Sequence, residues 1–227
     1  MKNLAFRNPT TQLLLTMVLF FFLTTLSAQT DKDNQYPQLL FKGFHKSTIL
    51  MKTGKTSEAF LNYNMVDEEM LIDNGGEYRV LNKLEDIDTV YIQDRKFVMV
   101  GKIFYEIVHK GKASIYLQHK CRYVSVGTQT AYGMTSHTND TPPVSSVQKG
   151  TQVRHLEMPD NVQVTSLDIC WVQIGADFQK FSNFKQYAKL FKEQEDQVKE
   201  FVKANDLDIK KTADLKKLGE YSSSLVK

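Results

Sequence analysis

Hydrophobic and polar residues alternate along much of residues 41–174, which is the pattern of β-strands. The longest alternation runs from Ala113 to Tyr123 and places Ile115, Leu117 and Cys121 on one side. Successive side chains of a strand point to opposite faces of its sheet. Antiparallel sheets can be buried on one face and wet on the other, whereas parallel sheets are usually covered on both. We therefore expect an antiparallel strand whose odd-numbered positions point inward and whose even-numbered positions face water.

Short turn sequences separate neighbouring strands along this region, at 52–55, 73–76, 94–95, 110–112 and 159–161. The glycines among them supply backbone angles that tight hairpins require. The last turn is expected to join 151–158 to 162–174 as a hairpin. No helix-length pattern interrupts the strands, which disfavours a βαβ fold. The predicted fold class is β-rich (α+β): an antiparallel meander forming a curved sheet, partial barrel or sandwich, followed by a small C-terminal helical segment.

Helical spacing of apolar residues replaces the alternation after Ala176. Phe184, Tyr187 and Phe191 begin this pattern, and two further sets follow before the end of the chain. The spacing predicts two or three short amphipathic helices. Helices this short are marginal in water, so their apolar faces should pack on one another or on the sheet. We divide the chain into a signal peptide at 1–28, an antiparallel β domain at 29–175 and a C-terminal helical subdomain at 176–227.

The first thirty residues have the pattern of a secretory signal peptide. Lys2 and Arg7 precede an apolar run at 13–26, and small residues follow it up to Ala28. The run is shorter than the roughly 20 residues that a membrane-spanning helix needs. We expect cleavage before Gln29 and export to the periplasm or cell surface, with no stable membrane span afterwards. An uncleaved membrane anchor is the alternative.

The charge balance argues against nucleic acid as a partner. The whole chain has 29 Lys and Arg residues and 26 Asp and Glu residues. Lys2 and Arg7 leave with the signal peptide, so the mature chain is close to neutral. Nucleic-acid-binding domains usually carry a clear excess of basic residues, which this chain lacks.

The two cysteines, Cys121 and Cys170, leave two alternatives open. Their spacing fits neither a zinc motif nor a Cys-x-x-Cys motif. An oxidising compartment permits a disulfide between them. Both also fall on strand faces expected to point inward, where a free cysteine behaves as a small apolar side chain.

Residues with catalytic chemistry do not form a recognisable set. The five histidines have no metal-binding spacing, and His119 is expected to be a core or rim histidine with its hydrogen bonds satisfied. Ser136 and His137 are adjacent but lack the second glycine of a Gly-x-Ser-x-Gly elbow. The acidic groups at 67–69 and 86–88 lie at strand ends, where carboxylates are normally solvated. We therefore predict no catalytic residue, no metal and no cofactor.

A long connection at 125–150 is the best candidate for recognition. Connections of this length are uncommon in compact domains. Its candidate binding residues, within 127–147, are Tyr132, Ser136, His137 and Asn139. Tyrosine with small polar side chains makes an adaptable contact surface, and loops on a rigid scaffold often carry binding. The alternative is a disordered excursion, which the same composition allows.

Several stretches resemble a group of uncharacterised exported proteins of Bacteroidetes. The resemblance extends over most of the mature chain and includes the Lys-rich helical tail. The stretches that carry it are 41–55, 61–64, 67–70, 87–90, 94–97 and 131–136. The resemblance implies an envelope location and a β-rich body with a helical tail. It implies no activity and no site residues.

These observations favour an exported, non-enzymatic binding or scaffold protein of the cell envelope. Its expected partner is an envelope protein or a glycan. The first alternative is a hydrolase acting on an envelope component or polysaccharide. The second is a structural component of an envelope assembly.

Overall fold

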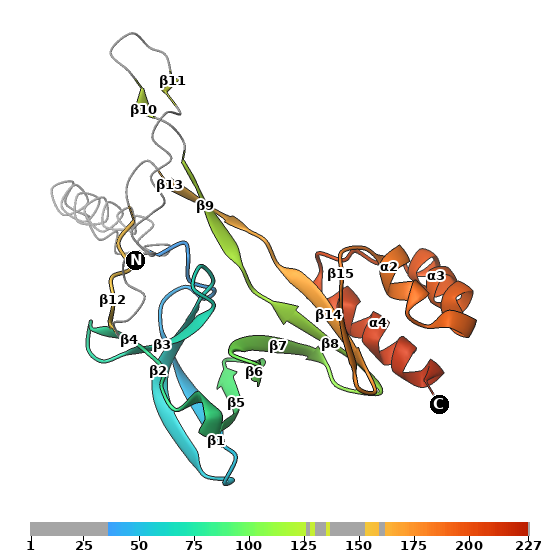
Figure 1. The fold of residues 1–227 in the computed structure, drawn as a ribbon, viewed down its shortest axis with the longest axis horizontal. Coiled ribbons are helices and arrows are strands. Elements are labelled where there is room, and N and C mark those ends of the chain that lie inside the picture. Colours follow the sequence, from blue (N-terminus) through green and yellow to red (C-terminus); the bar gives the residue numbers. More distant parts are fainter. Residues whose placement is uncertain (1–35, 126–127, 130–134, 137–152, 159–161, 227) are drawn as a thin grey trace, which may run out of the picture. The chain divides into compact units, whose positions relative to one another are not determined.

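The computed structural model describes residues 36–125, 128–129, 135–136, 153–158 and 162–226 (Figure 1). Eleven strands form one antiparallel sheet: β1 (His45–Met51), β2 (Thr56–Asn64), β3 (Glu69–Asp73), β4 (Tyr78–Val80), β5 (Ile87–Ile92), β6 (Arg95–Val100), β7 (Ile103–His109), β8 (Ala113–Gln118), β12 (Val153–Arg154), β14 (Ile169–Ile174) and β15 (Asp177–Phe181). Two smaller antiparallel pairs join β9 (Cys121–Ser125) to β13 (Val162–Ser166) and β10 (Thr128–Gln129) to β11 (Thr135–Ser136).

The order of strands across the large sheet is β12-β4-β3-β2-β1-β5-β6-β7-β8-β14-β15. The sheet is therefore open, with β12 and β15 at its edges. The turns expected at 52–55, 73–76, 94–95 and 110–112 all connect paired neighbours. The predicted fold class, an antiparallel β-rich body with a small C-terminal helical segment, is confirmed.

The hairpin expected between 151–158 and 162–174 is wrong. In this part of the chain β12 pairs with β4, β13 pairs with β9, and β14 pairs with β8. The turn sequence at 159–161 lies outside the described residues. Each strand thus pairs with one that is distant along the chain, because pairing depends on which neighbour buries the apolar face and not on sequence proximity alone.

The C-terminal segment contains α2 (Phe184–Lys189), the short 3-10 turn η4 (Lys192–Gln194), α3 (Glu195–Ala204) and α4 (Thr212–Leu225). A second 3-10 turn, η2 (Leu84–Asp86), precedes β5. The helices lie beside β8, β14 and β15 (Figure 1). Asn183 caps α2 by accepting a hydrogen bond from the Gln186 amide at 2.8 Å. The segment 176–227 also contributes a strand, since β15 extends the sheet before α2 begins.

Two large groups of buried side chains form the core. The first is formed by β1–β3, β5–β7, β9 and residues that flank these strands or follow β4, and comprises Phe41, Ile49, Leu61, Tyr63, Met65, Met70, Leu81, Ile87, Val90, Ile92, Phe97, Phe104 and Cys121. The Tyr63 hydroxyl donates to the Phe104 carbonyl at 3.4 Å, which ties β2 to β7 across this core. We call it the strand core.

The second group, here called the helix core, packs the three helices on β8, β14 and β15. Its members are Ala113, Ile115, Leu117, Cys170, Val172, Phe181, Tyr187, Ala188, Phe191, Val198, Leu215 and Leu218. Gly219 lets α4 approach β7 closely, because a Cβ atom there would lie 2.7 Å from the His109 ring. Amphipathic helices that are marginal alone are thus stabilised by burying their apolar faces.

The alternation at 113–123 predicts correctly that one strand face is buried, but its prediction that the other face is exposed to water is wrong. Ile115, Leu117 and Cys121 are buried, as expected. Tyr116 and Gln118, expected to face water, are buried too, because side chains from β14 and β15 cover them. The run also divides between β8 and β9, which belong to different sheets.

The disulfide that the sequence allowed is not formed. Cys121 and Cys170 are free buried thiols, and they belong to the strand core and the helix core respectively. Burial raises the pKa of Cys121 to about 12 and that of Cys170 to about 11, and nearby carboxylates add to both shifts. Each thiol therefore stays protonated at neutral pH.

Candidate functional site

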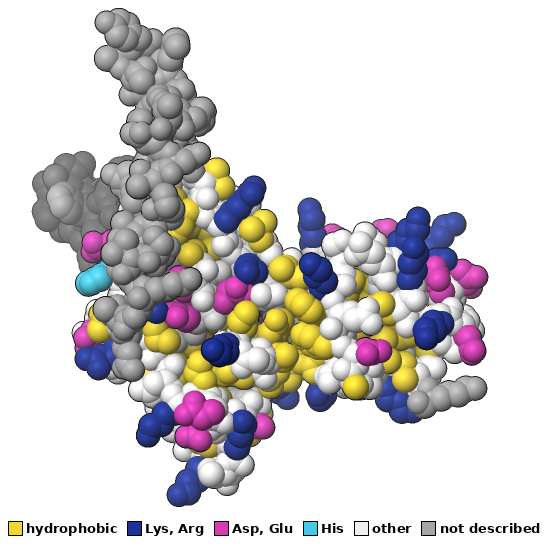
Figure 2. Space-filling model, viewed as in Figure 1, with side chains coloured by type: hydrophobic (Ala, Val, Ile, Leu, Met, Phe, Trp, Pro, Cys, Tyr) yellow, Lys and Arg dark blue, Asp and Glu magenta, His cyan; other side chains and the backbone are white. Residues whose placement is uncertain are grey.

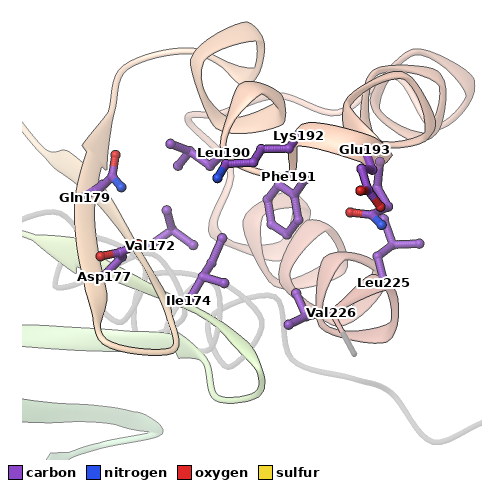
Figure 3. Close-up of a pocket in the computed structure, with 11 residues that line it drawn as sticks. Val172, Ile174, Asp177, Gln179, Leu190, Phe191, Lys192, Glu193, Leu225 and Val226 are labelled. Carbon is purple, nitrogen blue, oxygen red and sulfur yellow. The ribbon is translucent and has the colours of Figure 1, made fainter.

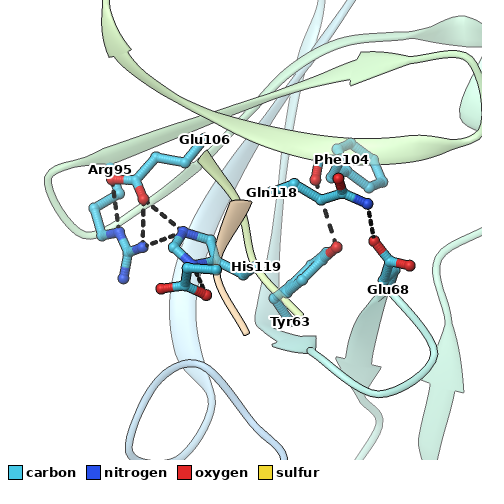
Figure 4. Close-up of polar contacts among 8 residues, drawn as sticks. Tyr63, Glu68, Arg95, Phe104, Glu106, Gln118 and His119 are labelled. Atoms are coloured by element: carbon cyan, nitrogen blue, oxygen red, sulfur yellow. Dashed lines mark hydrogen bonds and ion pairs between the residues drawn. The ribbon is translucent and has the colours of Figure 1, made fainter. Parts of the chain in front are cut away.

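Four ionisable side chains form a cluster in which Glu106 and His119 are buried and Arg95 and Asp168 are partly exposed (Figure 4). Arg95 begins β6, Glu106 lies in β7, His119 follows β8, and Asp168 precedes β14. Glu106 occupies the same register position as Leu117 on β8 and Phe97 on β6, so its carboxylate points toward the core. The fold thus places a carboxylate on an otherwise apolar face, where it needs a charged partner.

The cluster is densely bonded. Arg95 Nε donates to Glu106 Oε1 at 2.9 Å, and Arg95 Nη2 pairs with the other carboxylate oxygen. His119 Nε2 lies 2.7 Å from Glu106 Oε2 and 2.7 Å from Arg95 Nη2. His119 Nδ1 lies 3.1 Å from Asp168 Oδ1. When protonated, His119 donates to both carboxylates; when neutral, its Nε2 accepts from Arg95.

Aromatic rings from the strand core surround the cationic members. The Arg95 guanidinium lies 4.9 Å above the Phe41 ring centre and 5.6 Å from that of Phe97. Such contacts favour a cation that is partly withdrawn from water. The His119 ring packs against Tyr63 and Phe97. These contacts hold the cluster in one geometry.

The charges within the cluster support one another. Burial alone lowers the pKa of His119, but hydrogen bonds and charges from Asp168 and Glu106 outweigh it, so the pKa is raised. Burial alone raises the pKa of Glu106, but His119 and Arg95 outweigh it, so the pKa is lowered. With His119 protonated, two cations face two anions and the cluster is neutral as a whole.

The cluster forms part of the wall of a cavity of about 1030 Å³. Apolar side chains from both cores and their surroundings supply much of the lining, including Leu40, Val108, Leu117, Leu167, Phe181 and Leu215. Lys216 contributes a basic group from within α4, and Lys210 contributes one from two residues before this helix begins. This volume is at the upper end of the range typical of small-molecule sites.

The geometry suits holding a ligand better than activating a nucleophile. Both His119 nitrogens contact charged partners, and no hydrogen bond joins this ring to a hydroxyl or thiol among the described residues. The Cys170 thiol in the cavity wall stays protonated. Within the described ranges, no group of three or more His, Cys, Asp or Glu side chains could hold a metal ion.

A smaller hollow of about 400 Å³ separates the β14–β15 hairpin from the helices (Figure 3). Val172, Ile174 and Phe191 point into it. Its rim carries Asp177 and Lys192, together with a glutamate, so it has no preference for one sign of ligand charge.

Of the four binding residues expected from the sequence, the described structure includes only Ser136. Tyr132, His137 and Asn139 lie outside the described residues. Ser136 belongs to β11 and pairs with Thr128, but its side chain is not described. His119 is buried and hydrogen-bonded, as the sequence predicted.

Sequence reasoning missed the partners of His119. Arg95 was assigned to a turn, and Asp168 to the interior of a longer strand. Glu106 carried a usable signal, since it shares a strand face with the apolar residues Phe104 and Val108. A charged residue in such a position usually has a buried partner.

Comparison with protein-family models, curated proteins and solved structures finds no match for this chain. Among the described helices, none has the length and apolar character required to cross a membrane.

Proposed function

We propose that this chain is an exported, non-enzymatic binding protein of the cell envelope, and that the cavity beside the ion cluster holds its ligand. The observation that carries the proposal is the cavity of about 1030 Å³ with its fixed, internally neutralised polar wall. Preorganised polar groups beside an apolar lining are the usual features of small-molecule sites. Export is supported by the signal-peptide pattern at 1–28.

The lining favours a ligand with an apolar body and an acidic group. The cluster carboxylates are already paired with Arg95 and His119. Lys210 and Lys216 then remain as basic groups on the helical side, and among the described residues Asp94 is the one lining carboxylate outside the cluster. An acidic group is therefore attracted to the lysines, while the apolar body packs on the aliphatic side chains.

A fluorescent probe with this chemistry tests the proposal. We expect 8-anilinonaphthalene-1-sulfonate to bind the folded mature chain saturably at one site and to increase in emission. The double variant Lys210→Glu, Lys216→Glu should weaken binding at least fivefold, because it reverses the charge at the cavity wall. Lys185→Glu and Lys189→Glu, combined in α2, are the matched control at exposed lysines outside the cavity lining.

Equal binding by both double variants would argue against the cavity as the site. Circular dichroism on every variant separates this outcome from loss of folding. The connection at 127–147 stays a predicted partner surface. It is tested by recovering partners from the native envelope with the intact chain and with a deletion of these residues, and equal recovery would dismiss it.

A further inference from the structure

An aromatic cluster lies on the sheet face opposite the helix core. Trp171 of β14 stands in register with Tyr116 of β8 and Lys180 of β15, so these side chains share one face. Trp171 and Phe178 stack with ring centres 4.9 Å apart and planes 11° apart. The edge of Tyr105 meets both of these rings, at centre distances of 5.9 and 5.6 Å. The four rings form one continuous aromatic face, in which Tyr105 and Tyr116 are buried and Trp171 and Phe178 reach the surface.

Hydrogen bonds fix the polar edges of these rings. Trp171 Nε1 donates to Gln118 Oε1 at 3.0 Å, and the Tyr116 hydroxyl donates to Gln173 Oε1 at 2.9 Å. Lys110 Nζ donates to the same hydroxyl at 3.3 Å. Rigid aromatic groups lose little conformational entropy when a ligand packs on them. The aromatic face is therefore preorganised for binding.

The rim of this face is basic. Lys110 and Lys180 are exposed, whereas Trp171 and Phe178 are only partly buried. The nearby carboxylate of Glu68 is already engaged by Lys120 at 2.7 Å and by Gln118. Figure 2 shows hydrophobic side chains reaching the surface over the region of β7, β8 and β14 in the view drawn, with both basic and acidic side chains around them. Charge complementarity thus favours an anionic ligand.

We propose that this aromatic face binds an acidic polysaccharide. Sugar rings have apolar C–H faces that pack on the Trp171 and Phe178 rings, while their carboxylates pair with Lys180 and Lys110. This second site lies on the opposite side of the sheet from the cavity lining of Leu117 and Phe181, so it is independent of the proposed cavity ligand.

Single-stranded nucleic acid is the chemical rival, since it combines stacking bases with negative charge. The near-neutral mature chain has no extended basic footprint of the kind that nucleic-acid binding requires. Export of the chain, which is part of the proposed function, also places it where polysaccharides are the abundant acidic polymers. The observations therefore favour the polysaccharide.

Trp171 provides a direct assay because it is the only tryptophan of the chain. We expect oligogalacturonate to change its fluorescence saturably, and neutral malto-oligosaccharide of equal length to bind at least tenfold more weakly. The affinity should fall as salt is raised, because exposed charges are screened. Isothermal titration calorimetry gives an affinity that does not depend on the fluorophore.

Paired variants separate the site from general effects on the surface. Phe178→Ala should weaken oligogalacturonate binding at least tenfold, whereas Phe60→Ala, at a side chain 53% exposed on β2, should leave it unchanged. Lys180→Gln should weaken binding several-fold and reduce its salt dependence, and Lys185→Gln in α2 is its control. Thermal unfolding of each variant confirms that the protein is folded.

Three outcomes would overturn the proposal. The first is the absence of both a fluorescence change and heat with oligogalacturonate. The second is equal affinity for the acidic and neutral oligosaccharides, or an unchanged affinity in Phe178→Ala or Lys180→Gln. The third is tighter binding of a single-stranded oligonucleotide than of oligogalacturonate. Binding of the fluorescent probe that is equal in the two lysine double variants, together with retained oligogalacturonate binding, would overturn the cavity proposal alone.

Discussion

Replacing Glu106 with Gln tests whether the buried ion cluster stabilises the fold as its geometry implies. The substitution keeps the shape of the side chain and removes the carboxylate charge that Arg95 and His119 share. The Glu106 side chain is 6% exposed, that of His119 is 4% exposed and that of Arg95 is 25% exposed. The carboxylate is thus largely shielded from water, whereas Arg95 is partly hydrated.

The expected decrease in unfolding free energy follows from this burial. Removing one partner of a fully buried ion pair costs about 3–5 kcal/mol of unfolding free energy. Arg95 keeps some contact with water and His119 can release its proton, so both lessen the penalty. We expect Glu106→Gln to lower the unfolding free energy by about 2–3 kcal/mol near pH 5.5.

The stabilisation that His119 and Glu106 each contribute changes with pH in a defined direction. The raised pKa of His119 means that its stabilisation is fully present below the unfolded value of about 6.5 and is lost as pH rises through the folded value. The lowered pKa of Glu106 means that its stabilisation is present above its unfolded value and is lost as pH falls through the folded value. The difference between wild type and variant should therefore be largest at about pH 4.5–6.5.

Urea unfolding followed by circular dichroism, from pH 4 to pH 9, measures this difference. Glu58→Gln is the matched control, because Glu58 pairs with Lys46 on the surface with side-chain exposures of 60% and 65%. Exposed pairs contribute little, so the control should be close to wild type. If Glu106→Gln lowers the unfolding free energy by less than about 0.5 kcal/mol, or by an amount that does not vary with pH, the buried ion cluster does not stabilise the fold as proposed.

Three further predictions concern packing, thiols and processing. Gly219→Ala should lower the thermal unfolding midpoint, because the new Cβ would lie 2.7 Å from the His109 ring, and an unchanged midpoint would contradict the close approach of α4. Cys121 and Cys170 should react with a thiol reagent only after denaturation, and a mass change on reduction alone would show that they are bridged. Secreted protein should begin at Gln29 on N-terminal sequencing, and an uncleaved chain would contradict the signal peptide.

Local signals in the sequence were sufficient for the β-rich fold class and for most of its hairpins. Alternation between apolar and polar residues predicts a strand because backbone geometry alone sets its period of two. Turn residues such as Gly54, which adopts a φ of +81° between β1 and β2, act within a few positions of the chain. The burial of Ile115 and Leu117 followed from the same local rule.

The pairing of strands that are distant along the chain, and the meeting of the charged side chains in the ion cluster, follow only from the tertiary structure. The pairing of β12 with β4 and of β13 with β9 depends on contacts between distant segments that no local pattern encodes. The alternation predicts that Tyr116 faces water, but this side chain is buried because Phe178 of β15 packs against it.

The ion cluster shows most clearly which features local patterns predict and which depend on long-range packing. Local alternation is enough to predict that His119 occupies an inward-facing position and needs hydrogen-bond partners. Which partners it receives depends on the register that brings Glu106, Arg95 and Asp168 from three other elements to one point. Local periodicity selects the face of a side chain, whereas only the packed sheet selects the charges that meet there.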